Sequence, residues 1–295
     1  MARRSRSLKV SIVGAGSVGT ALALLLKRKG YRIVSVISRH RASARKAARL
    51  VGCKRFSHRI ADLHPGTNFL LIATSDESIG TVAEQISALP LHYPTVAAAH
   101  TSGFLTSDEL RSLRRKGATV FSFHPIQTFP HRLSAPDQLR NLKGISYGVE
   151  GSPKAIAFAR RLITRLGGTM LRVPKEQKIS YHLACVFASN YPVALLGAAE
   201  ELSAGFAQAP RLNHFHRLIE SSINNAVRLS AGKALTGPIA RGSLQTVSAH
   251  LKQLKAKHRH LESFYKTVGL YALELAVRGR KISPTMVKSL RKILQ

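Results

Sequence analysis

The sequence predicts an α/β domain with a doubly wound, mostly parallel sheet, followed by a second domain made only of helices. Three observations lead to this prediction. Apolar, β-prone runs alternate with helical patterns through residues 1–173, which is the order that builds a parallel sheet. A glycine-rich turn joins the first of these runs to the first helix. From Pro174 onward the pattern is helical only, so we expect the two domains to be 1–173 and 174–295.

The glycine-rich turn lies within residues 9–30, where a short apolar strand precedes G-x-G-x-x-G and an apolar helix. Gly14 allows the tight turn, Gly16 lets backbone approach a pyrophosphate, and Gly19 lets the helix pack closely on the strand. Backbone N–H groups at the start of the helix can hold phosphates. The turn therefore predicts a Rossmann-type dinucleotide site, against the alternative of a glycine turn that binds nothing. The expected cofactor-binding residues here are Gly14, Ala15, Gly16, Ser17, Val18 and Gly19.

The second strand, expected over residues 32–37, ends where an NAD enzyme usually carries an acidic residue for the ribose hydroxyls. This chain has Ser38 and Arg39 at that point. A hydroxyl and a planar guanidinium suit a 2′-phosphate, and the guanidinium can also stack on adenine. We therefore expect NADP (NADPH) as the cofactor, bound by Ser38 and Arg39. The alternative is a solvated basic turn.

The remaining strands and helices alternate up to residue 173. Strands are expected at residues 54–56, 68–73, 94–99, 118–123, 144–150 and 169–173. Helices are expected between them at residues 41–51, 79–89, 107–116 and 153–166. Ser107 is expected to cap the helix that it begins, with acidic residues in the first turn.

Polar residues follow three of these strands. In an open parallel sheet, ligands bind outside the carboxyl ends of the strands. Thr74 and Ser75 follow one strand and are expected to contact the cofactor. Ser102 follows the next strand, and His124 ends the one after it, before a proline that keeps the chain extended. Both are candidate catalytic residues, against the alternatives of an ordinary turn for Ser102 and a structural histidine for His124.

The helical domain is expected to begin with a long helix over residues 175–205, roughly 45 Å in length at ~1.5 Å per residue. Pro192 should kink this helix near Ala188. Apolar residues lie on several of its sides, which predicts a homodimer formed through this domain. The alternative is a helix that is buried wholly within its own chain.

Further helices are expected after the long one. A helix over residues 211–231 should end at Gly232, and a glycine and proline loop follows at residues 235–242. Residues 243–266 and 267–277 are expected to be helical. Ser283 should cap a last helix that reaches residue 294.

The chain is strongly basic, with 46 Lys and Arg against 14 Asp and Glu and a formal net charge of +32. These residues are spread along the chain without interleaved aromatic residues, so we expect only nonspecific binding of nucleic acid. Cys53 and Cys185 stand far apart without CxxC spacing, so neither a metal site nor a disulfide is expected. The longest run without Lys, Arg, Asp or Glu, residues 179–199, contains Ser, His, Asn and Pro, and we expect no membrane helix. The start lacks the apolar segment of a secretory signal, which favours the cytoplasm.

Three separated motifs resemble a known family. They are HPIQTF at residues 124–129, the stretch from Tyr181 to Tyr191, and LTGPIARG at residues 235–242, together with His250. From Val10 to about residue 271, the chain resembles the Rossmann-like oxidoreductases that carry the C-terminal domain of unknown function 2520. That family is similar in layout to pyrroline-5-carboxylate reductase, ketopantoate reductase and the 6-phosphogluconate dehydrogenase group, which often dimerise through a helical domain. Ser243 stands where the family commonly has Asp, so an acidic role is not carried over to that position.

The long helix carries the candidate proton donors for a hydride-transfer reaction. Hydride delivery to a carbonyl leaves negative charge on oxygen, so a reductase needs a proton donor beside it. Lys178 and His182 are four residues apart on one helix face, as are a Lys and Asn in the related dehydrogenases, and either is a candidate donor. Asn190 is expected to orient the substrate. Arg241 is expected to bind a substrate carboxylate, with Thr236 of the same loop beside it. The alternative is that Lys178 is a solvated lysine and His182 a hydrogen-bonded core residue.

These observations predict an NADP(H)-dependent oxidoreductase that acts on a small carbonyl or imine. The resemblance implies ketopantoate as one example of such a substrate. The alternative is a nucleotide-binding sensor or scaffold without turnover, because a fold does not determine a function. Binding of polyanions is a third class of function, and a salt titration of DNA binding separates it from the others.

Overall fold

The computed structural model describes residues 8–206, 212–279 and 282–295. The chain divides into two compact units, the first ending at Ser189 and the second beginning at Asn190. This division falls inside a helix, α7 (Lys178–Ser203). The first turns of α7 belong to the first unit because side chains such as Lys178 and Tyr181 contact the sheet strand β6 (Thr119–Pro125).

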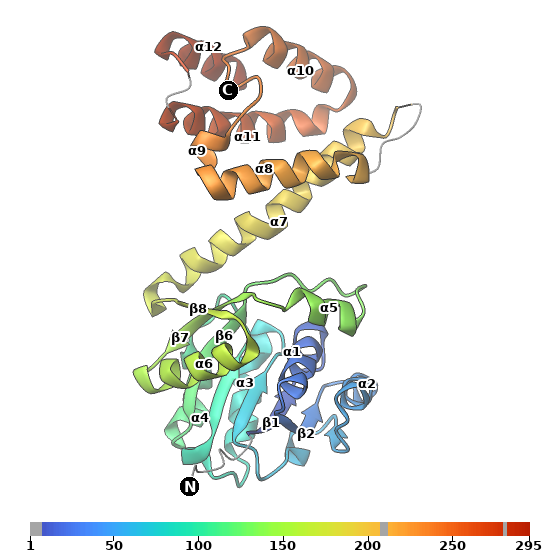
Figure 1. Ribbon diagram of the computed structural model, residues 1–295, viewed down its shortest axis with the longest axis vertical. Helices are drawn as coiled ribbons and strands as arrows, with labels where there is room; N and C mark the ends of the chain where they lie inside the picture. The colour runs from blue at the N-terminus through green and yellow to red at the C-terminus, as the bar shows by residue number, and fades with distance from the viewer. Residues whose placement is uncertain (1–7, 207–211, 280–281) are drawn as a thin grey trace. The chain divides into compact units, whose positions relative to one another are not determined.

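The first unit is built on an eight-stranded sheet in the order β3-β2-β1-β4-β5-β6-β7-β8 (Figure 1). Its strands are β1 Lys9–Val13, β2 Arg32–Ile37, β3 Phe56–Ser57, β4 Phe69–Ile72, β5 Ala97–His100, β6 Thr119–Pro125, β7 Ser146–Gly151 and β8 Thr169–Arg172. Neighbouring strands are parallel except β6 and β7, which are antiparallel. The strand order reverses between β1 and β4, and this switch point is where a doubly wound sheet forms its ligand crevice.

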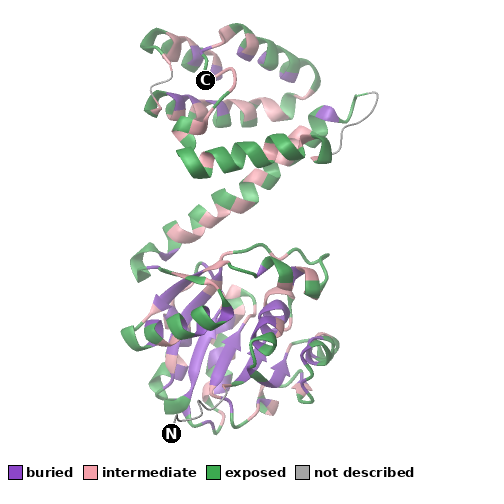
Figure 2. Ribbon diagram, in the orientation of Figure 1, coloured by how far each residue is buried: buried purple, intermediate pink, exposed green. Residues whose placement is uncertain are grey.

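The central strands are buried on both faces, as their continuous apolar sequences predict. All four residues of β4 and of β5 are buried, and Figure 2 shows the strands as the most buried part of this unit. One face is covered by α1 (Ser17–Arg28), α2 (Arg41–Val51) and α6 (Pro153–Leu166). The other face is covered by α3 (Asp76–Ser87) and α4 (Arg111–Arg115). The α/β, doubly wound and mostly parallel fold is therefore confirmed.

Some local predictions for the first unit were wrong. The helix expected from Ser107 starts as a 3-10 turn, η3 (Ser107–Leu110), whose cap is Thr106, because the Thr106 hydroxyl accepts the Asp108 N–H. A 3-10 turn, η2 (Tyr93–Thr95), takes up the start of the strand expected at residues 94–99, so β5 begins only at Ala97, whereas the 3-10 turn η1 (Ile60–Asp62) precedes β4 where a helix or turn up to Leu63 was expected. A short helix, α5 (Ala135–Asn141), was not predicted at all and packs against α1.

The chain then becomes helical, as predicted. A 3-10 turn, η4 (Lys175–Gln177), leads into α7, and the α-helix continues through Pro192 without interruption. The following elements are η5 Leu212–Phe215, α8 His216–Leu229, α9 Ala231–Ala234, α10 Leu244–Lys257, α11 Arg259–Arg278 and α12 Pro284–Leu294. Buried side chains of α10, α11 and α12, among them Val247, Leu273 and Leu290, form the core of the second unit.

Two helix ends differ from the prediction, and one agrees with it. The helix expected to end at Gly232 ends at Leu229, because Ser230 has a positive φ of 75° and breaks the helix first. Its expected first residue, Arg211, lies outside the described residues. The break between α10 and α11 falls at His258 rather than at residue 266. Ser283 caps α12 as predicted, since its hydroxyl accepts the Met286 N–H.

The segment Lys175–Ser203 contains an 18-residue stretch with a mean hydropathy of 1.3, which is long and apolar enough to cross a membrane by length and composition alone. It also carries His, Ser, Asn and Pro side chains. Its first turns donate hydrogen bonds to strand and turn residues of the first unit, as a helix of a folded domain does.

Candidate active site

The glycine turn after β1 has the geometry that its sequence predicts. Gly14 has a φ of +101°, and its N–H donates to the Ile37 carbonyl at the end of β2 (2.8 Å). A Cβ on Gly14 would overlap the Ala73 carbonyl oxygen, and one on Gly19 would overlap the Gly14 carbonyl oxygen. These two glycines therefore hold β1, α1 and the chain after β4 in close contact.

Gly16 differs from the other two glycines because, among the described residues, no atom beyond its chain neighbours and its own helix backbone lies within 4 Å of the position that its Cβ would take. It is the N-cap of α1, and no side chain caps the helix there. No acidic residue lies in the first turn of α1. Free backbone N–H groups, an open approach and the positive end of the helix dipole together suit a phosphate group.

The residues after β4 border the same turn. The Thr74 hydroxyl is buried and has no hydrogen-bond partner among the described residues. A Cβ on Gly14 would lie 2.9 Å from the Thr74 backbone nitrogen, so Thr74 directly adjoins the glycine turn. Ser75 is the N-cap of α3, and its hydroxyl lies 3.0 Å from that of Ser78. An unpartnered buried hydroxyl beside the turn is consistent with a polar ligand at this position.

Ser38 and Arg39 lie where the sequence places them, directly after β2. The Ser38 N–H donates to Ser57 at the end of β3 (3.1 Å), which positions the residue beside the carboxyl edge of the sheet. Arg39 is exposed. The two side chains directly after β2, a hydroxyl and a guanidinium, fit a 2′-phosphate.

Lys178, the first residue of α7, is the most unusual charged group of the first unit because only 1% of it is exposed. Its Nζ donates to the Ser122 hydroxyl on β6 (2.8 Å) and to the Ser102 carbonyl (3.3 Å). Burial lowers the pKa of Lys178 to about 8, while the negative charge of Glu150 acts in the opposite direction. An ammonium with a pKa near neutrality can both hold a proton and release it.

His124, at the end of β6, lies beside the long helix. Its Nδ1 is 2.6 Å from the Tyr181 hydroxyl of α7. Burial, and next the positive charge of Lys178, lower the pKa of His124 to about 4, so the ring is neutral at pH 7. Burial raises the pKa of Tyr181, so its hydroxyl keeps its proton and can donate it to Nδ1. In that arrangement the single N–H of the His124 ring is at Nε2.

Gly103 brings the two predicted histidines together. A Cβ on Gly103 would lie 2.9 Å from both His124 Nε2 and His182 Cδ2. The centroids of the two imidazole rings are 6.5 Å apart, and the His182 ring is also 6.2 Å from that of Phe104. The structure therefore places Lys178, His124 and His182 around the turn that follows β5.

Ser102 is buried in that turn, and its hydroxyl accepts the N–H groups of Phe104 (3.2 Å) and Leu105 (3.0 Å). Its carbonyl accepts from Lys178 and from the Ser122 hydroxyl. Ser102 thus shapes the turn and positions Lys178, while a catalytic role for its hydroxyl stays a prediction.

Three residues of the cluster were not predicted from the sequence: Ser122, Tyr181 and Glu150. Ser122 and Glu150 are cross-strand partners on β6 and β7. Glu150 is buried and accepts from both the N–H (2.5 Å) and the hydroxyl (2.9 Å) of Ser107. Ser122 and Glu150 each interrupt a largely apolar strand in the sequence. Because buried polar groups need partners, such an interruption was the signal that could have identified them.

Asn190, Thr236 and Arg241 belong to the second unit, so their roles toward the substrate stay predictions. Thr236 and Arg241 are exposed in the loop between α9 and α10. Gly237 and Gly242 give that loop its shape with positive φ angles of 94° and 71°.

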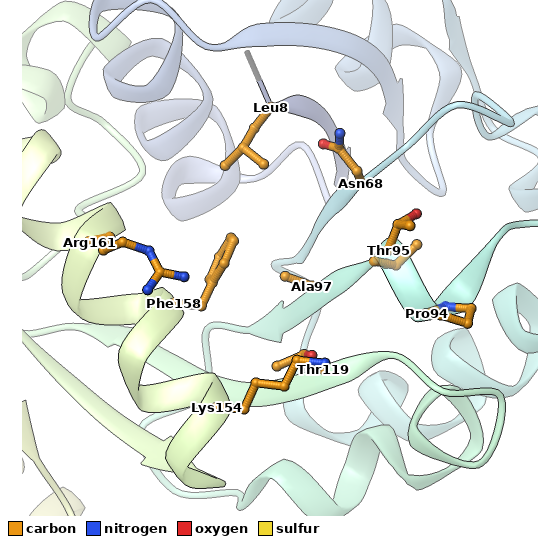
Figure 3. A pocket seen from close by; sticks show the side chains of 10 residues that line it. Leu8, Asn68, Pro94, Thr95, Ala97, Thr119, Lys154, Phe158 and Arg161 are labelled. Carbon is orange, nitrogen blue, oxygen red and sulfur yellow. The ribbon is translucent and has the colours of Figure 1, made fainter. Parts of the chain in front are cut away.

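A separate cavity of about 200 Å³ opens at the opposite, amino-terminal edge of the sheet (Figure 3). Phe158 and Arg161 of α6 lie on one side of it, and Pro94 and Thr95 lie on the other. No predicted site residue lines this cavity.

Comparison with known proteins gives two domain matches. The profile of a Rossmann-like domain matches residues 2–125, and that of the domain of unknown function 2520 matches residues 145–272. Comparison with the curated proteins finds no significant match.

Several solved structures share the fold over most of the chain. A protein from Bacteroides fragilis described as a candidate NADP oxidoreductase is 25% identical, covers 91% of this chain and 98% of its own, and has a TM-score of 0.75. Protein TM1727 from Thermotoga maritima is 24% identical over 92% of this chain and 99% of its own, with a TM-score of 0.69. The reductive aminase from Aspergillus terreus, in complex with NADPH and ethyl levulinate, is 17% identical over 97% and 99%, with a TM-score of 0.63. The chain is therefore a Rossmann-like protein that carries the C-terminal domain of unknown function 2520.

Proposed function

We propose that this protein is an NADP(H)-dependent oxidoreductase that transfers a hydride between the nicotinamide and a small carbonyl or imine substrate. One observation carries the proposal: the open glycine turn and the cluster of Lys178, His124 and Tyr181 lie in one compact unit, at neighbouring ends of its strands. The similarity to a candidate NADP oxidoreductase and to an NADPH-bound reductive aminase supports it. Neither the site nor the comparisons favour ketopantoate over other small carbonyl compounds.

The residues present fit a nicotinamide dinucleotide. The Gly14 turn and the first N–H groups of α1 would hold its phosphates, and Ser38 and Arg39 would hold a 2′-phosphate. Thr74 supplies an unpartnered hydroxyl beside the turn. When bound, the cofactor supplies or accepts the hydride.

Lys178 is the best candidate for the proton donor. Its pKa of about 8 leaves it mostly protonated at pH 7, whereas His124, with a pKa of about 4, is neutral and has a single N–H to offer. Lys178 Nζ holds the proton beside the Ser102 carbonyl and can pass it to the oxygen or nitrogen that gains negative charge. His124, oriented by Tyr181, is suited to donate a hydrogen bond to the same atom.

The experiment that tests this function is NADPH oxidation, followed by absorbance, across a panel of 2-keto acids and cyclic imines. We expect at least one member of the panel to be reduced with saturation kinetics. Saturable cofactor binding without oxidation by any member would instead support a nucleotide-binding sensor or scaffold.

The preference for NADP over NAD is the first testable prediction. Because Arg39 is exposed at the end of β2, Arg39→Asp should leave the fold intact. It should weaken NADPH binding roughly 10-fold or more, the scale of one lost charge-assisted phosphate contact, with little effect on NADH. Calorimetry on both cofactors checks this. Tighter binding of NADH than of NADPH by the unmutated protein contradicts the assignment.

A homodimer formed through the helical unit is the second prediction. α8 buries none of its 14 residues, and Ile223 and Val227, which are four residues apart on one helix face, are 53% and 80% exposed. A self-complementary apolar helix face is what a twofold dimer of identical chains requires. Light scattering at micromolar concentration should show twice the chain mass, and Val227→Glu should shift it toward the monomer. A monomeric unmutated protein would refute the dimer.

We also propose a cytoplasmic location. Both Cys53 and Cys185 are free thiols in the structure, which suits a reducing compartment. The high positive charge adds nonspecific attraction to nucleic acid at low salt but supplies no specific partner.

A further inference from the structure

The segment between β6 and β7 passes close to the start of α1. Residues 126–134, which we call the strap, run from the end of β6 along the carboxyl edge of the sheet to α5, which packs beside α1 (Figure 1). The position of the strap over the edge that carries the glycine turn makes it a candidate part of the cofactor site.

The strap is held in place by side chains of its own region. Gln127 Nε2 donates to the Asn141 carbonyl at the end of α5 (2.9 Å). Gln138, a buried residue of α5, donates to the carbonyls of Pro130 (2.9 Å) and Leu133 (3.3 Å). Phe129 packs against the main hydrophobic core. The position of the strap is therefore built into the fold of the first unit.

One strap residue reaches the helix start directly. His131 Nδ1 lies 3.2 Å from the hydroxyl of Ser17, the first residue of α1. Both side chains border a cavity of about 280 Å³ whose other lining residues include Gly16, Ser43, Lys46 and Ser134. Lys46 is the only fully charged residue among the lining residues, and no carboxylate is among them. The cavity therefore combines an open glycine backbone, hydroxyl and imidazole groups and one cation, which suits an anion.

We propose that His131 and Ser17 form an additional anion subsite that contacts the pyrophosphate of the dinucleotide. The proposal rests on the proposed function and adds the strap to the glycine turn as part of the binding machinery. A phosphate oxygen accepts hydrogen bonds from Ser17 and His131 in place of the contact that the two side chains make with each other. The pyrophosphate is favoured over the 2′-phosphate because Gly16 and Ser17 line the cavity, whereas Ser38 and Arg39 do not.

The test is calorimetric titration of the full-length protein with NADPH, NADH and ADP-ribose. ADP-ribose carries the pyrophosphate but neither the nicotinamide nor the 2′-phosphate. The variant His131→Ala removes the strap ligand. The matched control is Arg132→Ala, which removes a full charge from the next residue, an exposed side chain that does not line the cavity. Thermal unfolding of both variants checks that the fold is kept.

His131→Ala should weaken all three ligands by the same factor, about 10-fold, the scale of one lost hydrogen bond to a charged group. Arg132→Ala should change each affinity by no more than about twofold, since an exposed charge outside the cavity is screened by salt. Unchanged affinities in His131→Ala overturn the subsite, and so does a loss confined to NADPH. If the unmutated protein binds none of the three ligands, the proposed function fails together with the subsite.

Discussion

Lys178→Met will lower turnover at least ~100-fold with cofactor affinity nearly unchanged, because it replaces the buried ammonium with an apolar, unbranched side chain that is one heavy atom shorter. The fold should survive this change. The Ser102 carbonyl keeps the hydrogen bond from the Ser122 hydroxyl (3.1 Å) after the ammonium is lost, and methionine fills the buried space. Steady-state kinetics with the first substrate identified, together with NADPH titration, measure the two effects separately.

The pKa of Lys178 also predicts the direction in which reductive turnover changes with pH. The pKa of Lys178 is lowered to about 8, so the protonated form required for reduction predominates below that pH and is lost above it. Reductive turnover of the unmutated protein should therefore fall as pH rises through about 8. His124 and His182 also face this site, and the lowered pKa of His124, about 4, keeps its titration well below the window.

Lys175→Met is the matched control for Lys178. Lys175 lies one turn earlier, is exposed, and pairs at the surface with Asp108. It should retain near-normal turnover, because surface ion pairs contribute little and the residue does not touch the cluster. Near-normal turnover in both Lys178→Met and His182→Ala would remove this helix face from the mechanism and point to His124 and Ser102.

Two substitutions in the glycine turn separate its contribution to the stability of the fold from its contribution to cofactor binding. In Gly19→Ala the new methyl group overlaps the Gly14 carbonyl oxygen, so α1 and β1 must move apart. We expect a loss of about 3 kcal/mol in the free energy of unfolding, toward the upper end for overpacking. In Gly16→Ala nothing lies within 4 Å of the new group, so stability should stay within about 0.5 kcal/mol.

NADPH affinity should nevertheless fall at least ~10-fold in Gly16→Ala, because the methyl group occupies the approach of the phosphate to the backbone. Denaturant unfolding and calorimetry on the same preparations measure both quantities. An unchanged affinity in a well-folded Gly16→Ala protein would show that the turn only joins β1 to α1.

The geometry of the glycine turn was predictable because its determinants are local. Gly14, Gly16 and Gly19 act within six residues of one another, and each requirement can be stated from backbone geometry alone. The continuous apolar sequences of β4 and β5 likewise predict directly that these strands are buried. Element ends were harder, since the break at His258 carries neither glycine nor proline, and α5 is short and lies between Pro130 and residue 142.

The cluster of Lys178, His124 and His182 could be predicted only in part. Lys178 and His182 share a helix face, which spacing reveals, but the contact of His124 with Tyr181 joins residues 57 positions apart. Burial of the Lys178 ammonium against Ser102 and Ser122 depends on how α7 meets the sheet. Helical periodicity marks a face of α7 but does not identify which strand that face will meet.

The Gly14 turn is expected to hold one nicotinamide dinucleotide per chain. Calorimetric titration of the unmutated protein with NADPH, at two salt concentrations, tests it most directly. We predict a single saturable site per chain that persists at the higher salt concentration, is competed by NADP⁺, and is weakened in Gly16→Ala. Binding without saturation that vanishes as salt rises, or that is equal in Gly16→Ala, would contradict the claim and leave only attraction of the +32 chain for polyanions.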